Sequence, residues 1–263
     1  MLTLTAALDR SALARSTEEG HGSAGESPGA EPGYRVAMSV AVPGDQVEQL
    51  TRLQVLEDER LTPELRESWR GADAAMHCAE PENPMVAELC RSIEGKPLRG
   101  AVVRLTAEHG GVLDQRTFER ELADASVQNL YGKVRPVLAV TIDLSIGSGS
   151  YAGATTLFVE SRSGRLQWLA ASDATSGKSN EIRLPRTLKS AWQAVPRRDG
   201  FDILAVRCQP DLRDPTASGG DARFVIVYER YTFDGSRWLR KARQEPGFWE
   251  EDHGFPDLDR FPE

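Results

Sequence analysis

The chain has 263 residues, of which 40% are hydrophobic and 27% are charged, and its formal net charge is −8. This composition supports a hydrophobic core and excludes a wholly disordered chain, and no apolar run of about 18 residues is present to span a membrane as a helix. The basic residues are scattered, which argues against a nucleic-acid partner, because phosphate binding needs a local excess of Lys and Arg.

Residues 1–33 predict a disordered leader. Residues 16–33 consist mainly of Gly, Ser, Glu, Pro and Ala, which bury too little surface to offset the entropy of ordering. Residues 2–8 are mildly apolar but follow no basic segment, so they do not form an export signal, and this favours a cytoplasmic location. Tethers of this composition also follow export signals and lipid anchors, so a start further upstream and a periplasmic or envelope location stay open.

Ordered structure is expected from Tyr34, where apolar and small or polar residues alternate over residues 34–42 as in a half-buried strand. Residues 45–53 predict a helix, because Asp45 and Glu48 fit a capping box and the apolar residues after them keep nearly helical spacing. Two further helices are predicted from their capping residues, over residues 63–69 and 84–94.

From residue 100 the pattern indicates strands joined by short turns. The clearest strand spans residues 138–146, where large aliphatic residues alternate with small or polar ones. The links are too short for parallel crossovers, which favours an antiparallel sheet. One helix is expected among these strands, with Leu184, Leu188, Trp192 and Val195 on one face. Other strands are predicted over residues 100–107, 155–160, 165–171, 201–208, 223–233 and 237–243, while residues 112–131 fit a strand or a helix.

These elements predict an α+β protein with a mostly antiparallel, meandering sheet and a few short helices. We expect a leader over residues 1–33, a smaller α+β part over residues 34–131 and the main sheet over residues 132–263. Whether the last two parts share one core stays open. The acidic, aromatic-rich end of the chain is expected to pack as an irregular tail against the sheet.

Asp143 is the catalytic candidate, because it lies on the polar side of the clearest strand, next to a glycine-rich stretch at residues 147–153. Catalysis by paired carboxylates needs a second acid across a cleft, and Glu160, Asp173 and Asp202 are possible partners. The alternative is that Asp143 forms a cross-strand ion pair with an arginine.

Two glycine-containing segments partly resemble known phosphate-binding and nucleophile motifs. Residues 147–153 miss the spacing of both the nucleophile elbow and the dinucleotide loop, although Ser150 and Tyr151 are candidates to line a binding pocket. Residues 177–179 read Gly-Lys-Ser like the end of a phosphate-binding loop. Ser172 occupies the position where that motif requires its first glycine, so a surface turn is predicted.

His77, Cys78 and Cys90 form the weak metal alternative. Zinc sites usually show paired ligands at short spacing, and only one adjacent pair occurs here, so no metal or other cofactor is expected. Cys78 and Cys90 are also close enough in sequence for a disulfide, and whether the three cysteines are free or paired stays open. Trp249, in an acidic Pro/Gly context, is a candidate exposed aromatic for docking a partner.

No motif in the chain supports catalysis by itself, so the leading hypothesis is a non-catalytic binding or accessory protein for an unidentified protein or small molecule. A bacterial envelope would be its place if the tether follows an export signal. The first alternative is a hydrolase that uses Asp143 and a second carboxylate near residues 147–153. The second alternative is a cytosolic interaction protein.

Overall fold

The computed structural model describes residues 32–43, 50–61, 98–132, 135–143, 154–211 and 223–263. In these ranges the chain forms fifteen strands and two 3-10 helices, and it contains no α-helix. The expected α+β class is therefore wrong, because the described part of the chain is all-β. The helices expected over residues 63–69 and 84–94, and all but the last two residues of the leader, lie outside the described residues.

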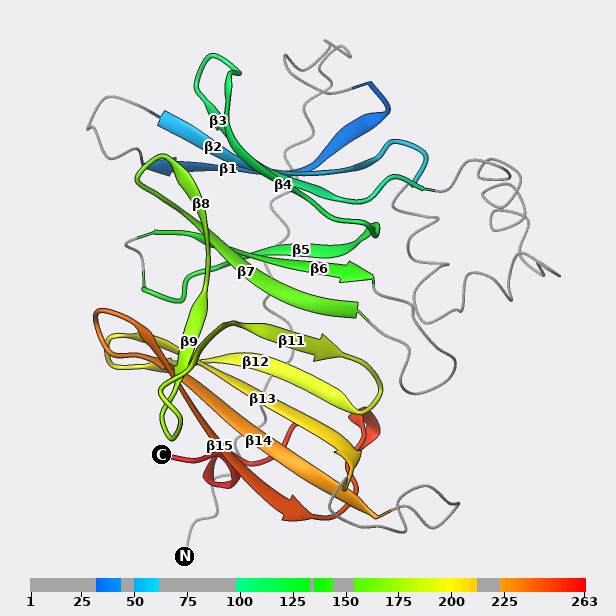
Figure 1. Cartoon of the computed structure of the whole chain (residues 1–263), viewed down its shortest axis with the longest axis vertical. Coiled ribbons are helices and arrows are strands. Elements are labelled where there is room, and N and C mark those ends of the chain that lie inside the picture. Colours follow the sequence, from blue (N-terminus) through cyan, green and yellow to red (C-terminus); the bar gives the residue numbers. More distant parts are fainter. Residues whose placement is uncertain (1–31, 44–49, 62–97, 133–134, 144–153, 212–222) are drawn as a thin grey trace, which may run out of the picture.

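Three sheets make up the described structure, and we call them upper, middle and lower from their order in Figure 1. The upper sheet has the order β1-β2-β3-β4, with β1 (Tyr34–Pro43), β2 (Leu50–Asp58), β3 (Val102–Ala107) and β4 (Val112–Thr117). The middle sheet has the order β11-β7-β6-β5, with β8 also paired to β7; its strands are β5 (Leu122–Gln128), β6 (Val137–Asp143), β7 (Ala154–Arg162), β8 (Arg165–Trp168) and β11 (Arg183–Arg186).

The lower sheet has the order β10-β9-β15-β14-β13-β12. Its strands are β9 (Ala170–Asp173), β10 (Ser179–Glu181), β12 (Ser190–Arg197), β13 (Gly200–Pro210), β14 (Phe224–Phe233) and β15 (Trp238–Pro246). Neighbouring strands in all three sheets are antiparallel, except that β15 and β9 are parallel. The expectation of mostly antiparallel pairing is confirmed.

Hydrophobic side chains fill the spaces between the sheets. The first core lies between the upper and middle sheets and includes Leu53, Leu105 and Val140. The second core lies between the middle and lower sheets and includes Phe158 and Ile203. The two central strands of the middle sheet, β6 and β7, are therefore covered on both faces. Residue 131 is the expected boundary between the smaller part and the main sheet. The first core takes side chains from residues before and after this boundary, and β5 pairs directly with β6 across it.

A third group of buried side chains lies on the other face of the lower sheet. Leu204 and Tyr228 from that sheet contact Trp249 and Phe261 from the end of the chain. This end contains two short 3-10 helices, Glu251–His253 and Leu258–Arg260. The expectation of an irregular tail packed against the sheet is confirmed.

The helix expected over residues 184–195 is wrong. Residues 183–186 form β11 in the middle sheet, and residues 190–197 form β12 in the lower sheet. A corner separates them, where Thr187 bridges to Ser190 and the Thr187 N–H donates to the Ser190 Oγ at 2.9 Å. Leu184 is fully buried while Leu188 is 58% exposed, so the residues taken for one helical face lie in different environments.

The helix expected over residues 45–53 is also wrong where the structure describes it, because residues 50–58 form β2. Leu53 and Val55 point into the first core, whereas Leu50 is 54% exposed. Residues 112–131, which fitted either element, contain the strands β4 and β5.

Several turns match their sequence signals. Residues 163 and 164 connect β7 to β8, with Ser163 at φ 52° and Gly164 at φ 70°, the left-handed pair that suits a tight hairpin. Residues 234–237 connect β14 to β15, and the Asp234 carboxylate accepts hydrogen bonds from the Ser236 and Arg237 N–H groups. The strand β1 begins at Tyr34, as expected.

Candidate functional site

Most of the residues suggested by the sequence lie where side chains are not described. Ser150, Tyr151, His77, Cys78 and Cys90 fall outside the described ranges. Asp143 is the last residue of β6 and its backbone pairs with Ala154 of β7, but its side chain is outside the described part of the structure.

The strand register separates Asp143 from the first of its suggested partners. Asp143 pairs with Ala154, and Glu160 lies six residues further along β7. At a rise of about 3.3 Å per residue the two backbone positions are roughly 20 Å apart, too far for a carboxylate pair. Glu160 instead faces Arg135, with Nε and Oε2 at 3.0 Å. Burial raises the pKa of Glu160, and the charge of Arg135 opposes that effect.

The other two suggested partners are also paired with arginines. The Asp202 carboxylate lies 3.6 Å from the Arg197 Nε, and the Asp173 carboxylate lies 2.6 Å from the Arg240 Nη1. An ion pair with an arginine was the alternative considered for Asp143, and it is what these three suggested partners form.

Trp249 is not the exposed aromatic that its Pro/Gly context suggested. It is 5% exposed, packs in the third core, and donates its indole N–H to the Gly254 carbonyl at 3.0 Å. Its neighbour Phe248 is 44% exposed and contacts the ring of Phe224 edge-on, with centroids 5.4 Å apart.

A pocket of about 390 Å³ is lined by the β9–β10 hairpin and by residues of β11, β13, β14 and β15. The hairpin forms one edge of the lower sheet (Figure 1). We call this pocket the hairpin pocket. Its floor is the face of the lower sheet that continues from the second core, with the buried residues Glu229 and Tyr231. Its rim carries the exposed residues Ser176, Lys178 and Asn180 from the hairpin.

Strand register explains why charged groups meet on the pocket floor. Tyr231 of β14 pairs with Arg240 of β15, and Arg240 pairs with Asp173 of β9. Glu229 and Arg207 project from the same face of β14 and β13, since Glu229 pairs with Ala205, two residues before Arg207. The alternation that buries Ile203 and Ala205 in the second core therefore brings the next residue on that face, Arg207, into the pocket.

Glu229 is the centre of the floor and is 5% exposed. The Arg240 Nε donates to Glu229 Oε1 at 2.9 Å, and the Tyr231 hydroxyl donates to Oε2 at 3.3 Å. Arg207 approaches the same Oε1 with its Nη2 at 3.5 Å, a longer and weaker contact. Glu229 therefore holds two guanidinium groups and one phenol in fixed positions.

These contacts set the charge states of the floor. Burial raises the pKa of Tyr231, and the negative charge of Glu229 raises it further. Burial on its own would lower the pKa of Arg240, but the charge of Glu229 and the hydrogen bonds to it outweigh burial and raise that pKa. Both groups therefore stay protonated at neutral pH.

The hairpin turn is held by Asp173. Its Oδ1 accepts hydrogen bonds from the Ser176 N–H at 2.8 Å, the Thr175 N–H at 3.1 Å and the Ser176 hydroxyl at 3.1 Å. These bonds, led by the one from the Ser176 backbone, lower the pKa of Asp173. Gly177 adopts φ +71°, which suits a glycine at this turn. The prediction that Gly177-Lys178-Ser179 forms a surface turn is confirmed.

The third acid of the pocket, Glu181, links the hairpin to the upper sheet. Arg116 of β4 and Arg183 of β11 each approach its carboxylate at 2.7 Å. Burial alone would raise the pKa of Glu181, but hydrogen bonds from the two arginines outweigh it and lower the pKa. The Arg116 guanidinium also lies 4.4 Å from the ring centroid of Trp168, which fixes its position.

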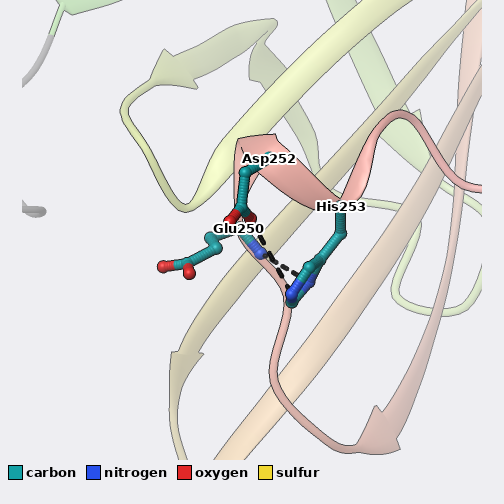
Figure 2. A group of neighbouring side chains, drawn as sticks. All are labelled: Glu250, Asp252 and His253. Atoms are coloured by element: carbon teal, nitrogen blue, oxygen red, sulfur yellow. Dashed lines mark hydrogen bonds and ion pairs between the residues drawn. The ribbon is translucent and has the colours of Figure 1, made fainter.

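A second cluster of ionisable groups lies in the tail, where Glu250, Asp252 and His253 surround the first 3-10 helix (Figure 2). Oxygen and nitrogen atoms of the three side chains come within 4.8 Å of one another. The His253 Nδ1 already accepts a long hydrogen bond from the Glu250 N–H at 3.4 Å, and the Nε2 lies 3.7 Å from Asp252. Both contacts belong to the turn, so the cluster is explained as a cap of this short helix.

Comparison with known proteins finds no matching family model, no matching curated protein and no matching solved structure. Among the described residues, no helix has the length and the apolar character needed to cross a membrane.

The hairpin pocket could not be predicted from the sequence, because its residues come from six strands and one turn. One signal was available: Arg207 and Glu229 are charged residues that each follow an apolar run, Ile203–Val206 in β13 and Val225–Tyr228 in β14. Charges in such positions are rarely buried unless they are paired. The pairing partners, however, are brought together only by the register of the sheet.

Proposed function

We propose that this chain is a non-catalytic binding protein and that the hairpin pocket is its ligand site. The observation that carries the proposal is that all three carboxylates lining the pocket, Asp173, Glu181 and Glu229, are already engaged by arginines. Acids held in this way position their neighbours and stay charged, which suits recognition of a ligand.

Proton-transfer chemistry would need different properties from these groups. A general base works best when its pKa lies near the working pH, whereas the pKa values of Asp173 and Glu181 are lowered by their hydrogen bonds. A phenol that acts as an acid or nucleophile at neutral pH needs a lowered pKa, whereas that of Tyr231 is raised. The groups keep fixed charges near neutral pH, so they supply a constant electrostatic field to a bound molecule.

The size and rigidity of the site also fit binding of a small molecule. A volume of about 390 Å³ lies within the range of small-molecule pockets. The ion pairs and hydrogen bonds of Glu229 and Asp173 hold the floor and the turn in place before any ligand arrives, which reduces the entropic cost of binding.

The proposal is tested by blocking the pocket. Wild-type protein is screened against a panel of small molecules by thermal shift, and each hit is confirmed by calorimetry. Asn180→Trp places an indole on the rim of the pocket, and we expect it to abolish binding of the hits. Gln115→Trp, on the exposed strand β4 outside the pocket, is the matched control and should bind like wild type.

Two results would contradict the proposal. Equal affinity in the Asn180→Trp and Gln115→Trp proteins would place the binding site elsewhere. Turnover of a hit that disappears in the Asn180→Trp protein would make the pocket an active site and overturn the non-catalytic role.

A further inference from the structure

We propose that the hairpin pocket binds the anionic group of its ligand, a carboxylate or a phosphate, through the side chains of Lys178 and Arg207. This inference rests on the proposed function and adds the chemical class of the ligand. The support for it comes from the hydrogen-bond donors that remain available in the pocket once its own ion pairs have formed.

The balance of charge in the pocket differs from that of the whole chain. Four cationic side chains line it, Lys178, Arg183, Arg207 and Arg240, against three carboxylates, which leaves an excess of one positive charge. The chain as a whole has a net charge of −8. The pocket is thus a local positive site on an acidic protein, and such a site attracts anions.

The carboxylates of the pocket are not available to a cationic ligand. Asp173 lies 2.6 Å from Arg240, Glu181 lies 2.7 Å from both Arg116 and Arg183, and Glu229 accepts from Arg240 at 2.9 Å. A cation could bind one of these carboxylates only at the cost of breaking an existing ion pair with an arginine. An anion faces no such cost.

Donor groups, in contrast, remain available. Within the described ranges the Lys178 ammonium has no carboxylate partner, and the residue is exposed on the pocket rim. Among the described residues Arg207, whose side chain is 37% exposed, makes one ion-pair contact, at 3.5 Å to Glu229. Its Nε is buried and has no hydrogen-bond partner among the described residues, so the guanidinium is not fully committed to the floor.

The hydrogen bonds of the turn explain why the side chains of Lys178 and Arg207, and not the backbone N–H groups of the turn, would bind the anion. Turn N–H groups often bind phosphate, but here the N–H groups of Thr175 and Ser176 donate to the carboxylate of Asp173. The chain therefore occupies its own backbone anion site. The Asp173 carboxylate also fixes the turn from which Lys178 extends.

The remainder of the ligand has room beside the anionic group. Ala171 and Tyr231 contribute apolar surface where the pocket meets the second core. A small organic acid or a phosphorylated compound with a short apolar portion fits this arrangement. The choice of probes distinguishes a carboxylate ligand from a phosphate ligand.

The experiment titrates the full chain with succinate and, separately, with inorganic phosphate, and follows backbone amide shifts by NMR. The neutral diamide of succinate is the matched uncharged probe. We expect one or both anions to shift the amides of residues 173–181 and the diamide to leave them unchanged. Binding should weaken as NaCl is added, because salt screens the attraction.

Two lysine variants make the test specific. Lys178→Ala should weaken the affinity for the anion by about tenfold, the effect of losing one charge-assisted hydrogen bond, and Lys178→Arg should retain most of it. Lys241→Ala removes the same charge from β15, where Lys241 is exposed and outside the pocket, and should bind like wild type.

The outcomes separate this inference from the proposed function. If neither anion shifts the hairpin amides, or if Lys178→Ala and Lys241→Ala bind equally well, the anionic class is wrong. If a neutral hit from the ligand screen is lost in the Asn180→Trp protein but kept in the Lys178→Ala protein, the binding function stands and only the anion inference fails. If no screened molecule and neither anion binds, both proposals fail.

Discussion

Leu138 and Ala139 are consecutive residues of β6, yet their side chains lie in different hydrophobic cores. Leu138 packs in the first core, between the upper and middle sheets, and Ala139 packs in the second, between the middle and lower sheets. In the backbone, Leu138 pairs with Val159 and Ala139 pairs with Phe158 of β7. The middle sheet therefore joins the two cores, and we expect the three sheets to unfold together.

The cooperativity of the two cores can be measured with Phe158→Ala. Phe158 is fully buried in the second core and contacts Trp192 edge-on, with ring centroids 5.1 Å apart. The cavity should reduce the free energy of unfolding by about 3–5 kcal/mol. Urea unfolding followed by fluorescence and by circular dichroism should give one coincident transition. Phe248→Ala, at a ring 44% exposed, is the control and should cost about 1 kcal/mol or less. Separate transitions for the two probes would show that the cores are independent.

Gly100→Ala should be among the most damaging small substitutions in the chain. A Cβ on Gly100 would lie 1.7 Å from the Phe118 carbonyl oxygen, which belongs to the backbone and cannot rotate away. We expect a loss of about 3 kcal/mol or more in the free energy of unfolding. Gly111→Ala is the matched control, since nothing lies within 4 Å of its added Cβ. Equal melting temperatures for the two variants would contradict this prediction.

Asp58 should make stability depend on pH. Its side chain is fully buried. Burial alone would raise its pKa, but hydrogen bonds from the Arg60 side chain and from the Arg99 and Arg60 N–H groups outweigh burial and lower the pKa from 3.8 to about 2. A lowered folded-state pKa means that the ionised carboxylate stabilises the fold above pH 4 and that this contribution is lost as the pH falls from about 4 to 2. The shift corresponds to about 2 kcal/mol.

The measurement compares wild type with Asp58→Asn by urea unfolding at several pH values. The difference in unfolding free energy should be largest near pH 6 and should shrink toward pH 2. Asp199→Asn, at an exposed aspartate, should change the unfolding free energy by less than about 0.5 kcal/mol. A difference between wild type and Asp58→Asn that stays constant over this range would rule out the proposed linkage.

Glu229→Gln should destabilise the protein, because it removes the negative charge that holds Arg240 and Arg207 on the pocket floor. We expect a loss of roughly 1–3 kcal/mol in the free energy of unfolding, since Arg207 loses its ion pair with Glu229 while Arg240 retains its ion pair with Asp173. Asp124→Asn removes a comparable charge from the exposed pair with Arg186, whose atoms are 3.3 Å apart, and should cost under about 1 kcal/mol. If thermal unfolding shows the same small loss in both variants, the floor does not depend on Glu229.

Local sequence signals predicted the strands and turns that depend on neighbours in the chain. The alternation of residues after Tyr34 led to the correct strand. The class was wrong because spacing is ambiguous: Leu184, Leu188 and Trp192 are four residues apart, which fits one face of a helix and also one face of a strand. The short corner at Thr187 and Ser190 ends one strand and starts the next, and no strong breaker marks it.

The candidate site was less predictable than the strands. Arg240, Glu229 and Asp173 meet only because β9 joins the lower sheet beside β15, in the parallel pairing that connection lengths argued against. Ala139 and Thr141 lie on the side of β6 that was expected to be polar, and both are buried there because a second sheet covers that face. A strand face made of small residues fits either exposure to solvent or close packing against another sheet, and the sequence does not distinguish these two environments.

The β9–β10 hairpin belongs to the lower sheet, but the strands before and after it, β8 and β11, belong to the middle sheet. The two crossing points are tied together, since the Ile182 N–H donates to the Leu169 carbonyl and the Leu169 N–H donates to the Phe158 carbonyl, each at 2.8 Å. Changes in the length or composition of the turn at residues 174–178 would therefore leave both anchor points intact. Under the proposed binding function, ligand preference would diversify at this turn while the stacked sheets keep their register, and selection would act on recognition and on foldability separately.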